Sequence, residues 1–197
     1  MVCFPFRNKD VCQITKTYGV KDPQYKSGKH DGIDIVSDGS RDVLAIRGGS
    51  VIRNGYLPSS WGRYIVIQHK DGKAAIYAHL SESKVYLNQQ IVEGEVIGIM
   101  GSTGNSTGPH LHIEIQNKYY EAGNTLDITQ YLSIENKVGR VEDILQTESI
   151  KIKLPNGDII SGESVNIKGS NYVKLRSVLE AMGFKVDWKD KTVIINA

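Results

Sequence analysis

Short runs in which hydrophobic and polar residues alternate fill most of the first 125 positions of the chain. Alternation with a period of two is typical of β-strands that bury one face. The predicted strands cover residues 42–46, 49–54, 64–69, 73–79, 96–100 and 110–116. Asp71-Gly72, between the third run and the fourth, is typical of a tight hairpin turn. No helical periodicity of comparable length precedes residue 125, so the pattern predicts a mainly β, two-layer antiparallel domain.

A short helical turn is predicted over residues 128–132, and it closes the first domain, residues 1–132. Residues 133–149 are polar and charged and are predicted to be a linker with a brief helix near Asp143. Residues 150–197 are predicted to form a second, small α+β domain. Its predicted elements are a strand over 150–154, an Asn156-Gly157 turn, a strand over 158–160, a helix over 174–182 ending at Gly183, and a hairpin of 184–188 and 192–196. The helix is indicated by apolar residues at spacings of three and four.

The composition is typical of a water-soluble globular chain. The 197 residues are 40% hydrophobic and 23% charged, with a formal net charge of +2. That charge is too close to neutral to indicate a nucleic-acid partner. No stretch approaches the roughly 20 apolar residues needed to cross a bilayer. The first residues lack a basic segment followed by an apolar run, so we expect synthesis in the cytoplasm without a signal peptide.

The two cysteines, Cys3 and Cys12, lie near the N-terminus. Their spacing fits no short zinc-binding pattern. A disulfide between them and two free thiols are equally compatible with the sequence.

The stretch with the most chemical content is Gly-Pro-His-Leu-His-Ile-Glu-Ile, residues 108–115. On a β-strand, His110, His112 and Glu114 lie on one face, and the apolar residues between them point to the other. A glycine-rich run over residues 101–108 predicts a loop at the entrance to this strand. Such a face either binds a metal or carries polar residues by coincidence.

The wider set of histidines favours a metal. The chain contains five: His30, His69, His79, His110 and His112. A catalytic zinc ion takes three protein ligands from histidine and carboxylate side chains and leaves a fourth position for water. His30, Asp34 and one of His110 and His112 supply such a set. Zinc lowers the pKa of its water from 15.7 to roughly 7, and the remaining histidines can move protons or stabilise the transition state.

The motifs His-x-x-x-Asp, Tyr-Ala-His-Leu and His-Leu-His occur in this order. Over roughly residues 15–132 the chain thereby resembles the lysostaphin-type zinc metallopeptidases. The resemblance implies a two-layer antiparallel β fold, peptidoglycan endopeptidase activity and one zinc ion, bound by His30, Asp34 and His112. It implies that His79 and His110 are the catalytic histidines, which orient or deprotonate the zinc-bound water and stabilise the oxyanion. All five positions match, which argues against a pseudoenzyme.

Three residues near these motifs are interpreted as structural. His69 lies at the predicted hairpin turn and is expected to be a turn or surface residue. Glu114 shares the ligand face and could support a metal ligand from behind, but a solvated strand carboxylate is the favoured interpretation. Asp31, next to His30, is expected to be exposed.

The resemblance places the substrate groove between loops. We expect residues 55–62 and 81–90 to form groove loops, with Trp61 and Tyr86 as candidate substrate-binding residues. The sequence leaves open which bond is cut, because a glycine bridge, a direct D-alanyl–diamino acid crosslink and a stem-peptide bond are all served by related enzymes.

Residues 150–197 resemble the copper-amine-oxidase-N-terminal-like "stalk" domain found in Gram-positive cell-surface proteins. The resemblance rests on the segment from Tyr172 to Trp188 and on Lys-Thr-Val-Ile-Ile, residues 191–195. It implies cell-wall binding or self-association, and a passive folding appendage is an equal alternative. No histidine lies beyond His112, so no metal is predicted in this domain.

Together these features predict a zinc endopeptidase that hydrolyses bacterial peptidoglycan and lyses the host cell wall as a bacteriophage endolysin. The endolysin interpretation rests on the order of the domains and on the lack of an export signal, which is an architectural analogy. An exported bacterial autolysin cloned without its leader fits equally well. The alternatives of another class are a non-catalytic member of the fold that binds walls or activates a hydrolase, and a metallohydrolase that acts on a non-wall peptide.

Overall fold

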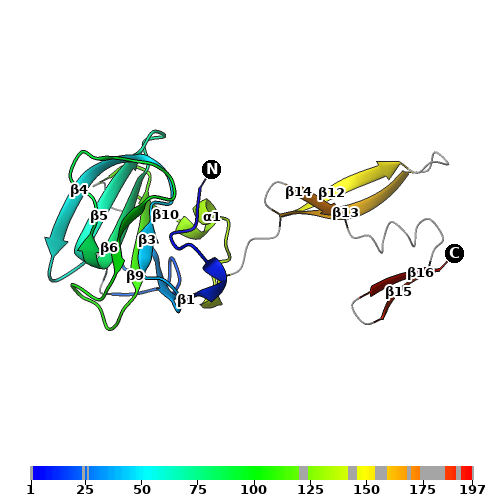
Figure 1. Ribbon diagram of the computed structural model, residues 1–197, viewed down its shortest axis with the longest axis horizontal. Coiled ribbons are helices and arrows are strands. Elements are labelled where there is room, and N and C mark those ends of the chain that lie inside the picture. The colour runs from blue at the N-terminus through cyan, green and yellow to red at the C-terminus, as the bar shows by residue number, and fades with distance from the viewer. Residues whose placement is uncertain are drawn as a thin grey trace. The chain divides into compact units, whose positions relative to one another are not determined.

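The computed structural model divides the chain into two compact units, Met1–Asp143 and Ile144–Ala197 (Figure 1). In the first unit it describes residues 2–23, 25, 27–119 and 124–141. In the second it describes the backbone of residues 146–153, 159–167, 170–173, 185–189 and 192–196. Every candidate site residue lies in the first unit.

The first unit consists of short strands, with a 3₁₀ turn near its start and a short helix near its end. In chain order its elements are η1 Lys9–Val11, β1 Cys12–Lys16, β2 Ile33–Ser37, β3 Asp42–Leu44, β4 Gly49–Leu57, β5 Gly62–His69, β6 Ala74–Ser83, β7 Gln90–Ile91, β8 Val96–Met100, β9 Leu111–Gln116, β10 Thr125–Leu126, α1 Ile128–Leu132 and β11 Gly139–Arg140. Each strand predicted from the alternating pattern is present, and the helix lies at the predicted residues.

The main path of the sheet runs β11-β1-β2-β9-β6-β5-β4-β7. Each described pairing along this path is antiparallel. The long strand β6 pairs with β9 through its first half and with β8 through its second half, and β8 also pairs with β3. The predicted antiparallel β architecture is confirmed, and it places β2, β9 and β6 next to one another.

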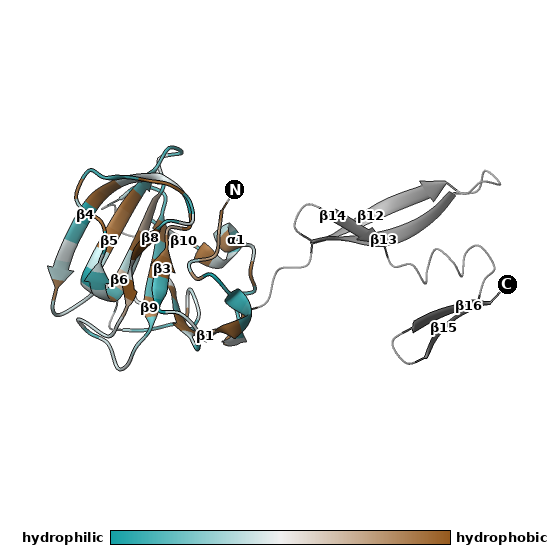
Figure 2. Cartoon of the chain, in the orientation of Figure 1, coloured by the Kyte–Doolittle hydropathy of each residue, from teal (hydrophilic) through white to brown (hydrophobic). Residues whose placement is uncertain are grey.

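The main core lies where β3 and β8 pack against one face of this sheet. Ile35, Tyr77 and Ile113 of the sheet cluster there with Val43 of β3 and Ile97 of β8. Figure 2 shows the hydrophobic residues along strands such as β5. The apolar residues of the alternating runs therefore supply this main core.

The opposite face of the sheet is also covered. Tyr64, Val66 and Ala78 form a second buried cluster there, against which Trp61 and Tyr119 pack. Ala78 lies directly across from His112 in the β6–β9 register, so the two residues share a face. This second cluster therefore forms the apolar surroundings of the histidine strand.

The predicted hairpin between β5 and β6 is confirmed. The His69 amide donates to the Lys73 carbonyl at 2.8 Å, and the Gly72 amide donates to the His69 carbonyl at 3.1 Å. Gly72 adopts φ +85°, a left-handed conformation that glycine reaches without steric cost. The Asp-Gly dipeptide thus fixes the register of β5 and β6.

His69 lies at the hairpin turn, as expected, but it is a buried residue and not a surface one, because only 3% of it is exposed. Its Nδ1 donates to the Gly48 carbonyl at 3.0 Å, and its Nε2 has no hydrogen-bond partner among the described residues. Burial lowers the pKa of this imidazole, although the bond to Gly48 and the nearby Asp71 act in the opposite direction. His69 is therefore a neutral core residue.

This buried ring predicts an acid-dependent loss of stability. Below the ordinary histidine pKa of about 6.5, the unfolded chain binds a proton that folded His69 rejects, so stability falls as the pH falls from 6.5 towards the lowered pKa. His69→Asn should flatten this dependence by up to about 1.4 kcal/mol per pH unit. Urea unfolding of both proteins between pH 5 and pH 7.5 measures the difference. Parallel pH curves would show that His69 accepts its proton in the fold.

The N-terminal segment and the expected linker differ from the sequence interpretation. β1 lies in the N-terminal segment, where no strand is predicted, and it pairs with β2. β11, which falls in the expected 133–149 linker, pairs with β1 through Gln13 opposite Arg140. β11 has only two residues, which are too few to show an alternating pattern. The first unit therefore extends past residue 132.

The helix α1 begins at a clear cap. The Asp127 carboxylate accepts from the Thr129 amide at 2.9 Å, and Ser133 ends the helix with φ +56°. Asx residues favour this N-cap position because they satisfy a free amide of the first turn.

Among the described residues, no helix is long and apolar enough to span a membrane.

Both cysteines are free thiols, which decides between the two alternatives left open by the sequence. Cys3 Sγ donates to the Ala45 carbonyl at 3.0 Å, and Cys12 Sγ donates to the Asn8 carbonyl at 3.3 Å. Burial raises the pKa of both thiols. They are therefore protonated packing residues at neutral pH.

The described residues of the second unit form two small sheets. β12 Gln146–Lys153, β13 Ile159–Ile167 and β14 Ser170–Val173 form an antiparallel three-stranded sheet. β15 Lys185–Lys189 and β16 Thr192–Asn196 form an antiparallel hairpin, as predicted. The predicted helices near Asp143 and over 174–182, and the Asn156-Gly157 turn, lie outside the described residues.

Candidate metal centre

Two neighbouring strands bring the candidate metal ligands together. Asp34 lies on β2 and His112 on β9, and the antiparallel register sets these two residues directly opposite each other. His30 lies three residues before β2, and its amide donates to the Val20 carbonyl at 2.8 Å. The ligands thus come from one strand pair and the turn that leads into it.

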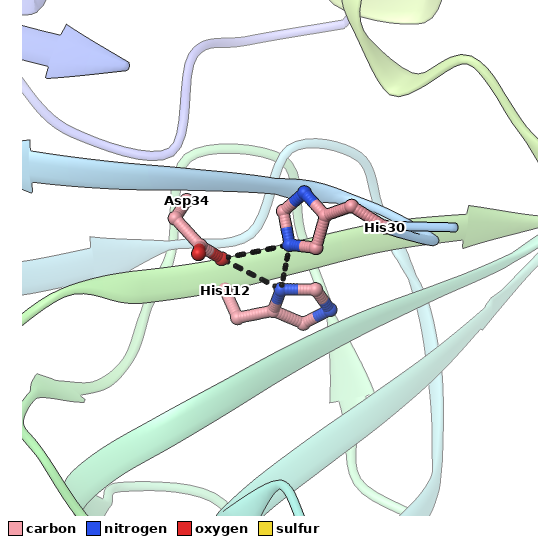
Figure 3. Close-up of side chains that lie close together, drawn as sticks. All are labelled: His30, Asp34 and His112. Atoms are coloured by element: carbon pink, nitrogen blue, oxygen red, sulfur yellow. Dashed lines mark hydrogen bonds and ion pairs between the residues drawn. The ribbon is translucent and has the colours of Figure 1, made fainter. Parts of the chain in front are cut away.

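The three side chains converge on one point (Figure 3). Asp34 Oδ1 lies 2.8 Å from His112 Nδ1 and 3.1 Å from His30 Nε2. The two histidine nitrogens lie 3.1 Å apart. One carboxylate oxygen and two imidazole nitrogens in this arrangement form a group that could hold a metal ion.

Hydrogen bonds on the far side of each ring fix which nitrogen faces this point. His30 Nδ1 donates to the Thr17 carbonyl at 2.9 Å. His112 Nε2 donates to Glu114 Oε1 at 3.0 Å. In their neutral forms both rings therefore direct a lone pair at Asp34, which already carries lone pairs of its own. Three acceptors that face one another need a cation between them, and this donor set fits zinc.

The charges of the group are coupled. Burial acts to lower the pKa of His112, but hydrogen bonds to Asp34 and Glu114 outweigh it and raise the pKa to about 9. Burial acts to raise the pKa of Asp34, but hydrogen bonds from His112 and His30 hold it well below its usual range. Without a metal, a proton on His112 therefore takes the place of the cation.

Glu114 is a buried carboxylate, which corrects the expectation of a solvated one. Only 2% of the residue is exposed. The carboxylate accepts from His112, from the Trp61 indole at 3.2 Å and from the Gln116 amide at 3.2 Å. Glu114 instead lies behind His112 and accepts from its Nε2. This position agrees with the alternative considered from the sequence, a residue that supports a metal ligand.

His79 and His110 lie beside the metal group. Their ring centroids are 4.7 Å apart, and the His79 centroid is 5.9 Å from that of His112. His79 Nδ1 donates to the Thr103 carbonyl at 2.8 Å, and His110 Nδ1 donates to the Gly108 carbonyl at 2.8 Å. Each ring thus keeps Nε2 for the site, and His110 Nε2 lies 3.7 Å from Asp34 Oδ1. Burial lowers the pKa of His79 to about 4, so this ring is neutral at pH 7.

The backbone at His79 is held in an uncommon conformation. Its φ of +60° lies in the left-handed region, which non-glycine residues occupy mainly where surrounding contacts enforce it. The His79 amide donates to the Trp61 carbonyl at 2.8 Å. Gly62 and Gly104 let the two flanking loops touch, because a Cβ on Gly104 would lie 2.2 Å from the Gly62 nitrogen. Thr103 and these glycines therefore set the position of His79, and the sequence interpretation assigned them no such role.

Tyr25 is a further site residue that the sequence interpretation missed. Its ring centroid lies 5.2 Å from that of His30 and 6.2 Å from that of His112. Burial and the carboxylates of Asp34 and Glu114 raise the pKa of its hydroxyl well above the ordinary value. The sequence offered only a single aromatic residue five positions before His30 as a signal.

The structure separates the two candidate substrate-binding residues. Trp61 reaches the site through its bond to Glu114, and its ring centroid lies 5.2 Å from that of Tyr64. Tyr86 is 70% exposed, and its backbone bonds are made with Gln89 in its own turn. Part of each expected groove loop belongs to a strand, because β4 extends to Leu57 and β6 to Ser83.

Asp31 is half-buried, not exposed as expected. Its carboxylate accepts from the Ser27 hydroxyl at 2.9 Å and from the Thr125 hydroxyl at 3.1 Å. It thereby ties the segment before His30 to β10 and takes no part in the metal group.

Residues 28–127 match the family model of peptidase family M23, a span that contains all five candidate metal and catalytic residues. The chain belongs to peptidase family M23. The structure is similar to the catalytic domain of lysostaphin, an antimicrobial peptidase from Staphylococcus simulans. That similarity has a TM-score of 0.56 and 29% sequence identity, and it covers 60% of this chain and 90% of that domain. The lysostaphin-type resemblance inferred from the motifs is thereby confirmed.

Two relatives carry an enzymatic activity in their names. The chain is 40% identical over 85 residues to the DD-carboxypeptidase/endopeptidase Mpg of Neisseria meningitidis, which is 43% of this chain and 19% of that protein. It is 34% identical over 98 residues to the glycyl-glycine endopeptidase ALE-1 of Staphylococcus capitis, which is 49% of this chain and 27% of that protein. The chain thus spans less than a third of each relative.

Proposed function

We propose that this M23 chain is a zinc-dependent endopeptidase that hydrolyses peptide bonds of bacterial peptidoglycan. The observation that carries the proposal is one constellation of five side chains. His30, Asp34 and His112 direct three ligand atoms at one point, and the rings of His79 and His110 lie beside them with 4.7 Å between their centroids. Binding alone would need the metal group but not two further histidines that each keep a ring nitrogen available.

The roles of the residues follow from hydrolysis of a peptide bond. His30 Nε2, Asp34 Oδ1 and His112 Nδ1 would hold zinc, which when bound supplies a Lewis acid for the carbonyl and a water of lowered pKa. A neutral imidazole is needed to accept a proton from the attacking water, and a protonated one is needed to donate to the leaving amine. The low pKa of His79 supports the neutral form of that ring. His79 and His110 together provide the acceptor and the donor at their Nε2 atoms.

Peptidoglycan is the proposed substrate because a relative that shares this region, ShyC of Vibrio cholerae, is named a peptidoglycan DD-endopeptidase; it is 31% identical over 109 residues, which is 55% of this chain and 25% of that protein. The names of Mpg and ALE-1 specify different bonds, a DD bond in one and a glycyl-glycine bond in the other. The choice of bond in this chain is therefore left to experiment.

We extend the proposal to a bacteriophage endolysin whose second unit binds the wall or associates with itself. The order of the two units supports it, because the catalytic unit, Met1–Asp143, precedes a smaller one, Ile144–Ala197. Pull-down with purified walls tests the second unit: the full chain should sediment with walls more strongly than the same chain with residues 146–197 deleted. Equal sedimentation contradicts a wall-binding role.

Hydrolysis of purified walls tests the function itself. Zinc-loaded protein should release fragments with new amino termini from walls with glycine bridges, from walls with direct crosslinks, or from both, as measured by amine labelling and mass spectrometry. A chelator should abolish the release and added zinc should restore it. In this mechanism the zinc ion is what lowers the pKa of the attacking water. New reducing sugar ends without new amino termini, or unchanged release in the chelator, contradict the proposal.

A further inference from the structure

Glu114 is a buried carboxylate to which the proposed mechanism assigns no role. It lies on β9 two residues after His112, and the hydrogen bond between them spans the face that both share. A buried carboxylate without partners is costly, because its charge loses the stabilisation that water provides. The hydrogen-bond partners of Glu114 therefore indicate which role this buried carboxylate has in the site.

Three donors converge on this carboxylate. Oε1 accepts from His112 Nε2 at 3.0 Å and from Trp61 Nε1 at 3.2 Å, and Oε2 accepts from the Gln116 amide at 3.2 Å. Since His112 Nε2 donates here, His112 Nδ1 is left to face Asp34 and His30.

Trp61 connects this carboxylate to the second half of the site. Its indole donates to Glu114, while its backbone carbonyl accepts from the His79 amide at 2.8 Å. Its ring packs on the cluster that includes Tyr64. Trp61, in the turn between β4 and β5, thus contacts both Glu114, which supports the ligand His112, and the backbone of His79.

We propose that Glu114 and Trp61 are positioning residues for the metal, an inference that rests on the proposed function. Glu114 fixes the tautomer of His112 and makes its Nδ1 a better ligand, and Trp61 holds the Glu114 oxygen in place. Outer partners of this kind typically change metal affinity by about 10–100-fold when they are removed. Asp34 and Glu114 also supply two negative charges, which balance a divalent ion. Trp61 therefore acts through Glu114, and its role as a substrate residue is not required.

Zinc affinity tests this inference directly, by competition with a chromophoric chelator on the full chain. Glu114→Ala should weaken zinc binding by about 100-fold and Glu114→Gln by about 10-fold, because the amide keeps an acceptor but not the charge. Trp61→Phe removes the indole N–H and keeps a ring, and it should weaken binding by up to about 10-fold. Glu82→Gln, a change of an exposed carboxylate on β6, is the matched control and should leave the affinity unchanged.

A second measurement separates positioning from simple loss of folding. In the Glu114→Ala background, Trp61→Phe should cause no further loss of zinc affinity, since its effect passes through the missing carboxylate. The ¹⁵N shifts of His112 in the zinc-loaded protein should show a protonated Nε2 in the wild type. If Glu114→Ala fails to fold, Glu114→Gln and Trp61→Phe carry the test.

The outcomes distinguish this inference from the proposed function. A wild-type protein that binds no zinc overturns both. A wild type that binds zinc while the Glu114 and Trp61 variants bind it equally well overturns the positioning roles and leaves the endopeptidase proposal standing. Additive losses from Trp61→Phe and Glu114→Ala show that Trp61 acts independently, which overturns the relay between them.

Discussion

Replacing His112 with alanine is expected to abolish zinc binding and wall hydrolysis together. Its Nδ1 lies 2.8 Å from Asp34 Oδ1 and 3.1 Å from His30 Nε2, so its loss leaves two ligands where a catalytic zinc site needs three. Removal of a residue that only supports a ligand weakens metal binding by up to about 100-fold. Removal of the ligand His112 itself should weaken zinc binding by more than this. Metal content measured by mass spectrometry and chelator competition on the purified full chain provide the readout.

The control for this change is another buried histidine on a strand. His69→Asn alters a ring that contacts Gly48 and lies outside the metal group, so zinc content should stay at the wild-type level. Because His112→Ala also removes one of the three donors to Glu114, His112→Gln serves as a second variant that keeps the volume and a hydrogen-bonding group. Circular dichroism confirms that each variant is folded. A folded His112 variant with one zinc ion per chain means that the ion binds elsewhere.

The metal group shows what could be read from the sequence and what could not. The residues alone gave His30, Asp34 and one of two histidines, and the family resemblance chose His112. In the structure the choice follows from the register of β2 and β9, which sets Asp34 opposite His112. That pairing joins positions 78 residues apart. A period-two pattern cannot reveal it, because the pattern identifies strands but not their neighbours.

The errors at Glu114 and His69 have a common physical cause. Alternation along a strand tells which residues share a face, but it does not tell whether that face is covered. Trp61 and the second apolar cluster cover the face of Glu114, and the fold around Gly48 covers His69. Both contacts depend on segments far away in the sequence. The same reasoning explains why Thr103 and Tyr25 were missed, since their roles arise from loop packing.

Replacing His110 with alanine is expected to keep zinc and lose most of the activity. The His110 ring donates to the Gly108 carbonyl and contacts the ring of His79. The three converging ligand atoms belong to His30, Asp34 and His112, and His110 is not among them. Loss of one proton-transfer group typically lowers the rate by about 10²–10⁴-fold. Zinc affinity should remain close to that of the wild type, which separates this variant from His112→Ala.

The pair of variants forms a test that neither provides alone. Fragment release from purified walls measures activity, and chelator competition on the same preparations measures zinc. His79→Asn is the matched change at the neighbouring ring, because asparagine tolerates the left-handed backbone that His79 adopts with φ +60°. It should resemble His110→Ala, with zinc retained and activity reduced. If His110→Ala loses zinc in parallel with activity, His110 is a ligand and the division of labour along β9 is wrong. If it retains both, the proton transfers pass through His79 alone, whose neutral ring then serves as both acceptor and donor.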